Sequence, residues 1–322
     1  MMERTVLMTG ASRGIGRAVA EQLLAKGCRL CLGLRNPAGI KGTLLDSERV
    51  LPVAYDAGHP EQAVELVDAA SRWAGGVDSL IHCAGILHRT PLLFEEGQEG
   101  ELEELWRINV MGPWWLTRAA WPSLQSSGHG RIQVLVSMSG KRVKGRMAGY
   151  PVSKFALMAL CQSMRNEGFE HGIRVTAICP SWVNTAMARS VRSVPAESMT
   201  QPQDLAGLMA SLLELPDTAV PFEIAVNCAL ETLPATTGSD ESSAMCLFAA
   251  LGLLAPRLIL LLMWLFNSSF VLQPFSGMSV PTPVLPVAGL LLLPTTTLSF
   301  YWPHPPSVAC LPSTAGWWWP SA

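Results

Sequence analysis

Apolar and polar positions along residues 1–232 follow two periods, one typical of buried strands and one typical of helices. Short apolar runs predict strands at Val6–Met8, Arg29–Leu34, Val50–Val53, Ser79–Ile81, Ile132–Val136, Arg174–Ile178 and Glu223–Val226. Apolar residues at helical spacing predict helices at Ile15–Ala25, Glu61–Trp73, Leu102–Gln125, Tyr150–Glu170 and Gln203–Leu215. This alternation favours an α/β fold in which helices wind on both faces of a parallel sheet of about seven strands. Such sheets bind ligands at the carboxyl ends of their strands.

The end of the chain has a different composition. Residues 233–322 hold three of the 48 charged residues, 12 of the 24 prolines and five of the 11 tryptophans. We therefore expect one domain over residues 1–232 and an irregular, apolar tail rich in Pro, Leu and Trp over 233–322, disordered or membrane-associated. The apolar run 246–266 is long enough for a membrane span but contains Arg257. A membrane anchor, an altered-frame tail and an interaction segment all stay open, and the abrupt loss of charge favours the altered frame.

Charge and cysteine content narrow the class of protein. A net charge of −2 gives no sign of a nucleic-acid partner. Of the eight cysteines, only Cys28 and Cys31 have C-x-x-C spacing, and no second pair completes a set of metal ligands, so we expect free thiols, no metal site and a reducing compartment. The N-terminus enters the first strand pattern directly, without a signal-peptide layout. These observations predict a cytoplasmic protein.

A glycine-rich turn joins the first predicted strand to the first predicted helix. Glycines permit a tight turn and let the backbone approach a pyrophosphate, and the start of a helix offers free N–H groups and a positive dipole end. Such a turn between a strand and a helix is typical of a Rossmann-like dinucleotide site. We expect the cofactor to contact Gly10, Ser12, Arg13, Gly14, Ile15 and Gly16.

The residues after the second predicted strand indicate which dinucleotide binds. An acidic residue there would accept hydrogen bonds from the 2′-hydroxyl of NAD, but Leu34 occupies this position. Arg35 follows directly, and Arg13 lies in the glycine-rich turn, so two guanidinium groups suit a 2′-phosphate. The sequence therefore predicts NADP(H) rather than NAD(H). The alternative is a pair of solvated surface arginines.

Ser137, Tyr150 and Lys154 form a candidate proton-transfer group. Tyr150 and Lys154 are four residues apart in a predicted helix and so share one face. An ammonium beside a phenol lowers the tyrosine pKa from its reference value of about 10, toward the range that suits a general acid or base. Ser137 lies thirteen residues before Tyr150. A bare Tyr-x-x-x-Lys pair arises often by chance, so its surroundings decide its meaning.

The glycine-rich turn, the Ser137, Tyr150 and Lys154 set and their order together resemble the short-chain dehydrogenase/reductase family, in its single-domain branch. The resemblance covers the chain from about residue 4 to residue 230. It implies that Asp56 binds the adenine ring and that Ala84 and Gly85 face the cofactor ribose. It further implies that the segment with Val183 and Thr185 contacts nicotinamide and diphosphate.

The same resemblance implies a role for each catalytic residue. Tyr150 exchanges a proton with the oxygen of a carbonyl or alcohol. Lys154 lowers the Tyr150 pKa and binds the nicotinamide ribose, and Ser137 holds the substrate oxygen. Asn109 links Lys154 to solvent through a water molecule. The implied activity is an NADP(H)-dependent oxidoreductase that interconverts a small-molecule carbonyl and an alcohol.

Two positions depart from the family pattern. His82 and Cys83 stand where the family usually has two asparagines that tie the central sheet together, and Ser181 replaces a glycine. We expect altered local stability at the first position and a more restricted loop at the second. The proton-transfer groups are untouched.

Other interpretations stay open beside the enzyme. A sensor or scaffold protein would keep the NADP site without catalysis, although the intact catalytic set argues against it. A membrane-tethered reductase would use the tail. We expect a homo-oligomer unless the tail interferes. Substrate identity stays open, because the segment Ala186–Met199 after the last cofactor contact has a mixed composition.

Overall fold

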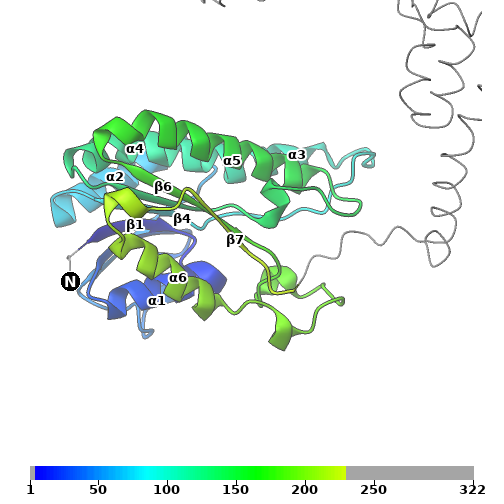
Figure 1. Cartoon of the computed structure of the whole chain (residues 1–322), viewed down its shortest axis with the longest axis horizontal. Coiled ribbons are helices and arrows are strands. Elements are labelled where there is room, and N and C mark those ends of the chain that lie inside the picture. Colours follow the sequence, from blue (N-terminus) through cyan, green and yellow to red (C-terminus); the bar gives the residue numbers. More distant parts are fainter. Residues whose placement is uncertain (1–3, 230–322) are drawn as a thin grey trace, which may run out of the picture. The chain divides into compact units, whose positions relative to one another are not determined.

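A seven-stranded parallel sheet lies between two layers of helices in the computed structural model, which describes residues 4–229 (Figure 1). The strand order is β3-β2-β1-β4-β5-β6-β7, and every neighbouring pair is parallel. The chain thus builds outward from β1 in two directions, which opens a crevice at the carboxyl ends of β1 and β4. The strands are β1 (Thr5–Thr9), β2 (Arg29–Leu34), β3 (Val50–Ala54), β4 (Ser79–His82), β5 (Arg131–Leu135), β6 (Arg174–Pro180) and β7 (Glu223–Val226).

Helices cover both faces of the sheet, so its central strands are apolar on both sides. Val6 and Met8 of β1 pack in the core under α1 and α6, while Leu7 packs in the core under α2, α4 and α5. This alternation along one strand joins the two cores into a three-layer fold (Figure 1). The helices are α1 (Gly14–Ala25), α2 (Pro60–Ala74), α3 (Glu99–Trp106), α4 (Gly112–Ser126), α5 (Gly149–Gly168) and α6 (Pro202–Glu214).

The predicted doubly wound α/β fold is confirmed, and each predicted strand agrees with the structure within two residues at either end. One helix prediction is wrong in detail. The expected single helix Leu102–Gln125 is α3 and α4 joined by a π-helical segment, Arg107–Met111. This wider turn carries Asn109, and π-helical turns inside helices are often found at functional sites. Apolar periodicity cannot reveal a π-helical turn, because the helical spacing of apolar residues continues through that turn.

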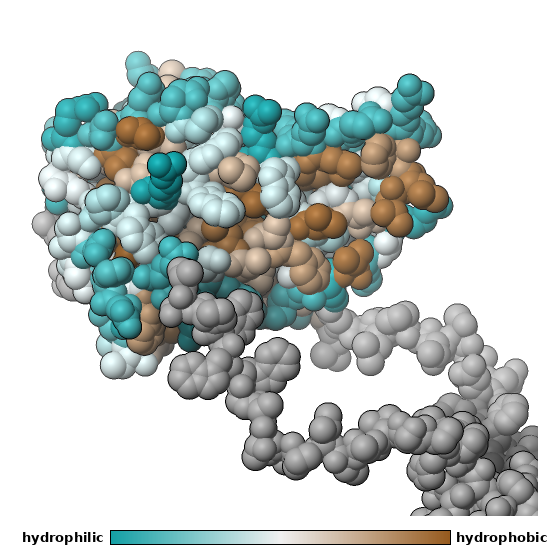
Figure 2. Space-filling model, turned by 90° about the horizontal axis from the view of Figure 1, so that it is seen from above, coloured by the Kyte–Doolittle hydropathy of each residue, from teal (hydrophilic) through white to brown (hydrophobic). Residues whose placement is uncertain are grey.

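An apolar surface lies on the outer side of α3, α4 and α5. Trp106, Trp114, Val152 and Phe155 are each between 43% and 59% exposed, and apolar residues interrupt the hydrophilic surface in this view (Figure 2). Exposed apolar groups on neighbouring helices are typical of subunit contacts. The expected homo-oligomer stays a prediction.

The predicted tail 233–322, with its apolar run 246–266, lies outside the described residues. Within residues 4–229, no helix combines the length and the apolarity needed to cross a membrane. The domain boundary near residue 232 and the three interpretations of the tail therefore stay predictions.

Candidate active site

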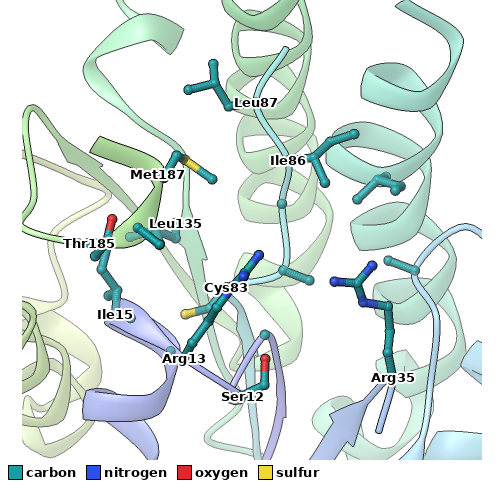
Figure 3. Close-up of a pocket in the computed structure, with 18 of the residues that line it drawn as sticks. Ser12, Arg13, Ile15, Arg35, Cys83, Ile86, Leu87, Leu135, Thr185 and Met187 are labelled. Atoms are coloured by element: carbon teal, nitrogen blue, oxygen red, sulfur yellow. The ribbon is translucent and has the colours of Figure 1, made fainter. Parts of the chain in front are cut away.

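A cavity of about 700 Å³ opens at the carboxyl ends of β1, β2 and β4 (Figure 3). Its wall consists of the glycine-rich turn after β1, the residues after β2, β3 and β4, and the segment after β6. The volume falls within the range of roughly 300–1,000 Å³ typical of cofactor and small-molecule sites. The cavity therefore occupies the crevice where a doubly wound sheet binds ligands.

The glycine-rich turn packs too tightly for larger residues. Gly10 has φ +76°, and a Cβ there would lie 2.5 Å from the backbone nitrogen of Ala84. A Cβ at Gly16 would lie 2.2 Å from the carbonyl oxygen of Gly10. Helix α1 begins without a side-chain cap and without an acidic residue in its first turn, so its N–H groups stay open to an anion. The turn therefore fits the pyrophosphate of a dinucleotide.

The residues after β2 bring positive charge to the cavity. Leu34 is buried at the end of β2 and offers no hydrogen-bond acceptor to a ribose hydroxyl. Arg13 and Arg35 are exposed, and both line the cavity. Their guanidinium groups point into it from two sides (Figure 3). Asp56, which also lines the cavity, accepts a hydrogen bond from the backbone N–H of Gly58 at 2.8 Å and so orders the turn before α2.

Most of the predicted cofactor contacts converge on this cavity. Its lining includes eleven of the fourteen: Gly10, Ser12, Arg13, Gly14, Ile15, Gly16, Arg35, Asp56, Ala84, Gly85 and Thr185. Tyr150, Lys154 and Val183 are not among the lining residues, and Val183 is buried in a β-bridge with Thr200. Ser137 and Asn109 are likewise outside the lining.

The predicted catalytic residues Ser137, Tyr150 and Lys154 lie next to the cavity, with Tyr150 and Lys154 buried and Ser137 half-buried. Tyr150 lies in the first turn of α5 and is 8% exposed, and Lys154 is 4% exposed one turn later. The Lys154 ammonium lies 5.7 Å from the centre of the Tyr150 ring and donates a hydrogen bond to the Leu135 carbonyl at 3.1 Å. Leu135 lines the cavity, so Lys154 stands directly behind the wall.

Ser137 holds its hydroxyl in position through an unusual backbone conformation. Its φ is +148° with ψ 157°, a region that side chains other than glycine rarely adopt and that costs about 1–3 kcal/mol. The Ser137 Oγ accepts a hydrogen bond from the backbone N–H of Ser139 at 3.0 Å and also bonds Tyr150. Strain of this kind is concentrated at functional sites, which supports Ser137 as a functional residue.

Burial sets the protonation of the catalytic pair. It raises the pKa of Tyr150 to about 12, against a smaller lowering by the hydrogen bond with Ser137. It also lowers the pKa of Lys154 to about 8. The expected lowering of the Tyr150 pKa by Lys154 is therefore wrong for the protein alone, because desolvation of the phenolate outweighs the attraction of the ammonium. Tyr150 is fully protonated at neutral pH.

Asn109 uses its amide to hold the loop after β4. Its Oδ1 accepts a hydrogen bond from the Ile86 N–H at 2.9 Å, and its Nδ2 donates to the Ile86 carbonyl at 3.0 Å and to Ser153 Oγ at 3.1 Å. Both amide donors are thus occupied, and one lone pair of Oδ1 remains for a water molecule. A Cβ at Gly85 would lie 3.2 Å from Asn109 Oδ1 and 3.7 Å from Lys154 Nζ. Asn109 and Lys154 therefore meet at the Gly85 backbone.

His82 and Cys83, which together form the first departure from the family pattern, differ in burial. His82 is 3% exposed, with Nε2 2.9 Å from Thr117 Oγ1, so it ties β4 to α4. Burial lowers the pKa of this imidazole to about 3, which keeps it neutral. Cys83 lines the cavity, and burial raises the pKa of its thiol to about 12. A neutral imidazole and a protonated thiol thus replace the two asparagines.

Several cavity residues lie beyond the family motifs. Four of them follow β4 and were not predicted from the sequence, namely Leu87, His88, Arg89 and Glu104. Ala186, Met187 and Ser190 follow β6 and belong to the segment Ala186–Met199, which the sequence analysis connected with substrate identity. His88 Nε2 lies 2.7 Å from Glu104 Oε2, and Arg89 Nη2 donates to Ser190 Oγ at 2.9 Å. The signal available in the sequence was their position directly after predicted cofactor contacts.

The fold and the site together define a class of protein. It is a doubly wound α/β protein in which the glycine-rich turn fits a dinucleotide and a Ser–Tyr–Lys group lies next to that site. Known proteins agree with this class. The family model described as short chain dehydrogenase matches residues 4–196. The chain therefore belongs to the short chain dehydrogenase family.

Individual relatives share this region of the chain. Agropine synthesis reductase from Rhizobium rhizogenes is 33% identical over 230 residues, which are 71% of this chain and 53% of that protein. The chain thus spans about half the length of this relative. An alcohol dehydrogenase from the archaeon Thermococcus sibiricus, solved with 5-hydroxy-NADP, is 28% identical with a TM-score of 0.63, covering 70% of this chain and 96% of that one. A 3-ketoacyl-(acyl-carrier-protein) reductase from Brucella melitensis, solved with NADH, is 25% identical with a TM-score of 0.64, covering 71% and 99%.

Proposed function

We propose that this protein is an NAD(P)-dependent oxidoreductase that interconverts a carbonyl and an alcohol, with Tyr150 as general acid and base. The observation that carries the proposal is the pairing of Tyr150 with Lys154, whose ammonium lies 5.7 Å from the centre of the Tyr150 ring and donates a hydrogen bond to the Leu135 carbonyl in the cavity wall. The nicotinamide, when bound, supplies or accepts the hydride.

The protonation of the group suits proton donation. With a pKa of about 12, Tyr150 keeps its proton at neutral pH and can give it to a carbonyl oxygen. The hydrogen bond with Ser137 lowers the pKa of Tyr150, so it stabilises the phenolate that remains. The charged Lys154, 5.7 Å from the ring, acts in the same direction on a developing phenolate. The arrangement supports reduction of a carbonyl at neutral pH.

Replacing Tyr150 tests this role. Tyr150→Phe keeps the ring but removes the proton donor, so turnover should fall by about 10²–10⁴-fold. Cofactor binding, measured by nicotinamide fluorescence, should persist. The assay follows NADPH absorbance with a panel of aldehydes and ketones. Unchanged turnover in the variant would contradict the assignment, and wild-type protein that binds cofactor but reduces no compound would support a sensor or scaffold instead.

We further propose that NADP(H) is preferred over NAD(H). The support is the cavity position of Arg13 and Arg35 together with Leu34, which lacks an acceptor for the NAD ribose. Arg35→Ala should raise the KM for NADPH roughly tenfold or more, because a charge-assisted contact to the 2′-phosphate is lost. The KM for NADH should change little. Arg72→Ala, an exposed arginine in the last turn of α2, is the matched control. An equal effect of Arg35→Ala on both cofactors would contradict the preference.

A further inference from the structure

Arg89 brings a positive charge to the part of the cavity that the predicted cofactor contacts leave uncovered. We propose that this part binds a carbonyl substrate carrying a carboxylate or a similar anionic group, and that Arg89 holds that group. The inference rests on the proposed function, since it assigns the substrate class of the same site.

The location of Arg89 follows from the loops that carry it. Leu87 and Met187 lie on the side of the cavity far from Ser12 in the glycine-rich turn (Figure 3). Arg89 follows Leu87 closely in the chain and lines the same cavity, and its side chain reaches Ser190 on the segment after β6. This end is bounded by the two segments that follow β4 and β6. It is the part of the cavity left for a substrate.

Backbone hydrogen bonds tie the loop that carries Arg89 to the start of α5. The carbonyl of Thr90, the next residue, accepts hydrogen bonds from the N–H groups of Ala148 at 2.9 Å and Gly149 at 3.2 Å. Tyr150 follows Gly149 directly. The loop that carries Arg89 is therefore fixed to the start of α5, the element on which Tyr150 lies.

Within residues 4–229, no carboxylate balances the charge of Arg89. His88 and Glu104, also in the lining, bind each other at 2.7 Å. The only hydrogen bond that Arg89 makes within residues 4–229 is to the neutral hydroxyl of Ser190, and no carboxylate of that region lies within ion-pair distance of it. The planar guanidinium keeps further N–H donors in a fork that matches a carboxylate.

The residues near Arg89 in the cavity lining indicate the chemistry of the rest of the ligand. Leu87 and Met187 line the cavity, and Met187 is 48% exposed there. Apolar side chains beside one cation favour a ligand with a short apolar body and an anionic end. The proposed substrates are therefore oxo acids with an aliphatic or aromatic body.

Pairs of oxo acids and their methyl esters test the inference. We would measure kcat/KM for 2-oxohexanoate, 4-oxohexanoate and 5-oxohexanoate, each beside its ester, so that only the charge differs within a pair. Wild-type protein should prefer the acid in at least one pair. Arg89→Ala should lower kcat/KM for that acid roughly tenfold or more and leave the ester unchanged, because a hydrogen-bonded charge contact is lost. Calorimetric binding of the same acid to the cofactor-bound protein should weaken in parallel.

Ser190→Ala is the matched control. It breaks the bond between the two loops but keeps the Arg89 charge, so the preference for acid over ester should survive. If Arg89→Ala lowers kcat/KM equally for the acid and the ester, the inference is overturned and Arg89 only connects the two loops. If the variant instead raises the KM for the cofactor, the inference is overturned and Arg89 is a cofactor contact. Reduction of neutral ketones without any acid preference would overturn it while the proposed function stands. If no carbonyl compound is reduced, the proposed function fails, and equal calorimetric binding of acid and ester would then overturn the role of Arg89 separately.

Discussion

Replacing Asn109 separates two roles that the same side chain can have. A water relay to Lys154, as the family resemblance implies, requires only the amide near Lys154. The structure adds a mechanical role, because the amide makes three hydrogen bonds, two of them to the backbone of Ile86. We expect Asn109→Ala to loosen the loop after β4 as well as to slow proton transfer.

The size of the effect follows from these contacts. Asn109 is fully buried, and the alanine variant leaves the N–H and carbonyl of Ile86 and the hydroxyl of Ser153 without this partner. Three hydrogen bonds at about 1 kcal/mol each, with partial rescue by water at the cavity wall, give a loss of about 2–3 kcal/mol in the free energy of unfolding. For a domain of this size the melting temperature should fall by roughly 4–12 °C. Cofactor affinity should fall too, since Gly85 and Ile86 line the cavity.

Thermal unfolding and cofactor fluorescence measure both consequences. Ser153→Ala is the graded comparison, because it removes a bond to Asn109 and one to the Tyr150 carbonyl but keeps both Asn109–Ile86 bonds. We expect the loss of these two bonds to cost about 1–2 kcal/mol. An Asn109→Ala protein with wild-type melting temperature and cofactor affinity, impaired only in turnover, would refute the mechanical role and leave the relay alone.

Two further predictions concern the turn and the buried histidine. Gly10→Ala should abolish cofactor binding, because the new Cβ would lie 2.5 Å from the backbone nitrogen of Ala84. Gly207→Ala in α6 is the control, because a Cβ there meets open space and cofactor binding should stay normal. Normal binding by both variants in the fluorescence assay would contradict the packing argument. Below pH 6.5, His82 takes up a proton in the unfolded chain, whereas in the folded chain it does so only near pH 3. The free energy of unfolding should therefore fall by up to about 1.4 kcal/mol for each unit by which the pH is lowered through this range. His82→Asn should flatten that slope in denaturant titrations at several pH values, and an unchanged slope would show that His82 is not its source.

The order of strands and helices could be predicted from the sequence because it depends on local periodicity. Apolar runs marked all seven strands, since a sheet covered on both faces leaves no polar alternation in its central strands. The dinucleotide turn could also be predicted from the sequence. Gly10 and Gly16 are required by close contacts within one strand–turn–helix unit and with the residues that follow the neighbouring strand β4. Tyr150 and Lys154 were paired by helix geometry alone.

Burial and long-range contacts depended on the tertiary structure. The pKa of Tyr150 rises to about 12 because neighbouring elements exclude water from the start of α5, which helix spacing cannot report. Asn109 bonds residues 23 and 44 positions away, and Arg89 bonds a residue 101 positions away. The sequence by itself determined the fold, the dinucleotide turn and the candidate Ser–Tyr–Lys group, all of which follow from short-range spacing. Only the packing of the loops after β4 and β6 decided which side chains face the substrate end of the cavity, because no local pattern records which distant segments meet there.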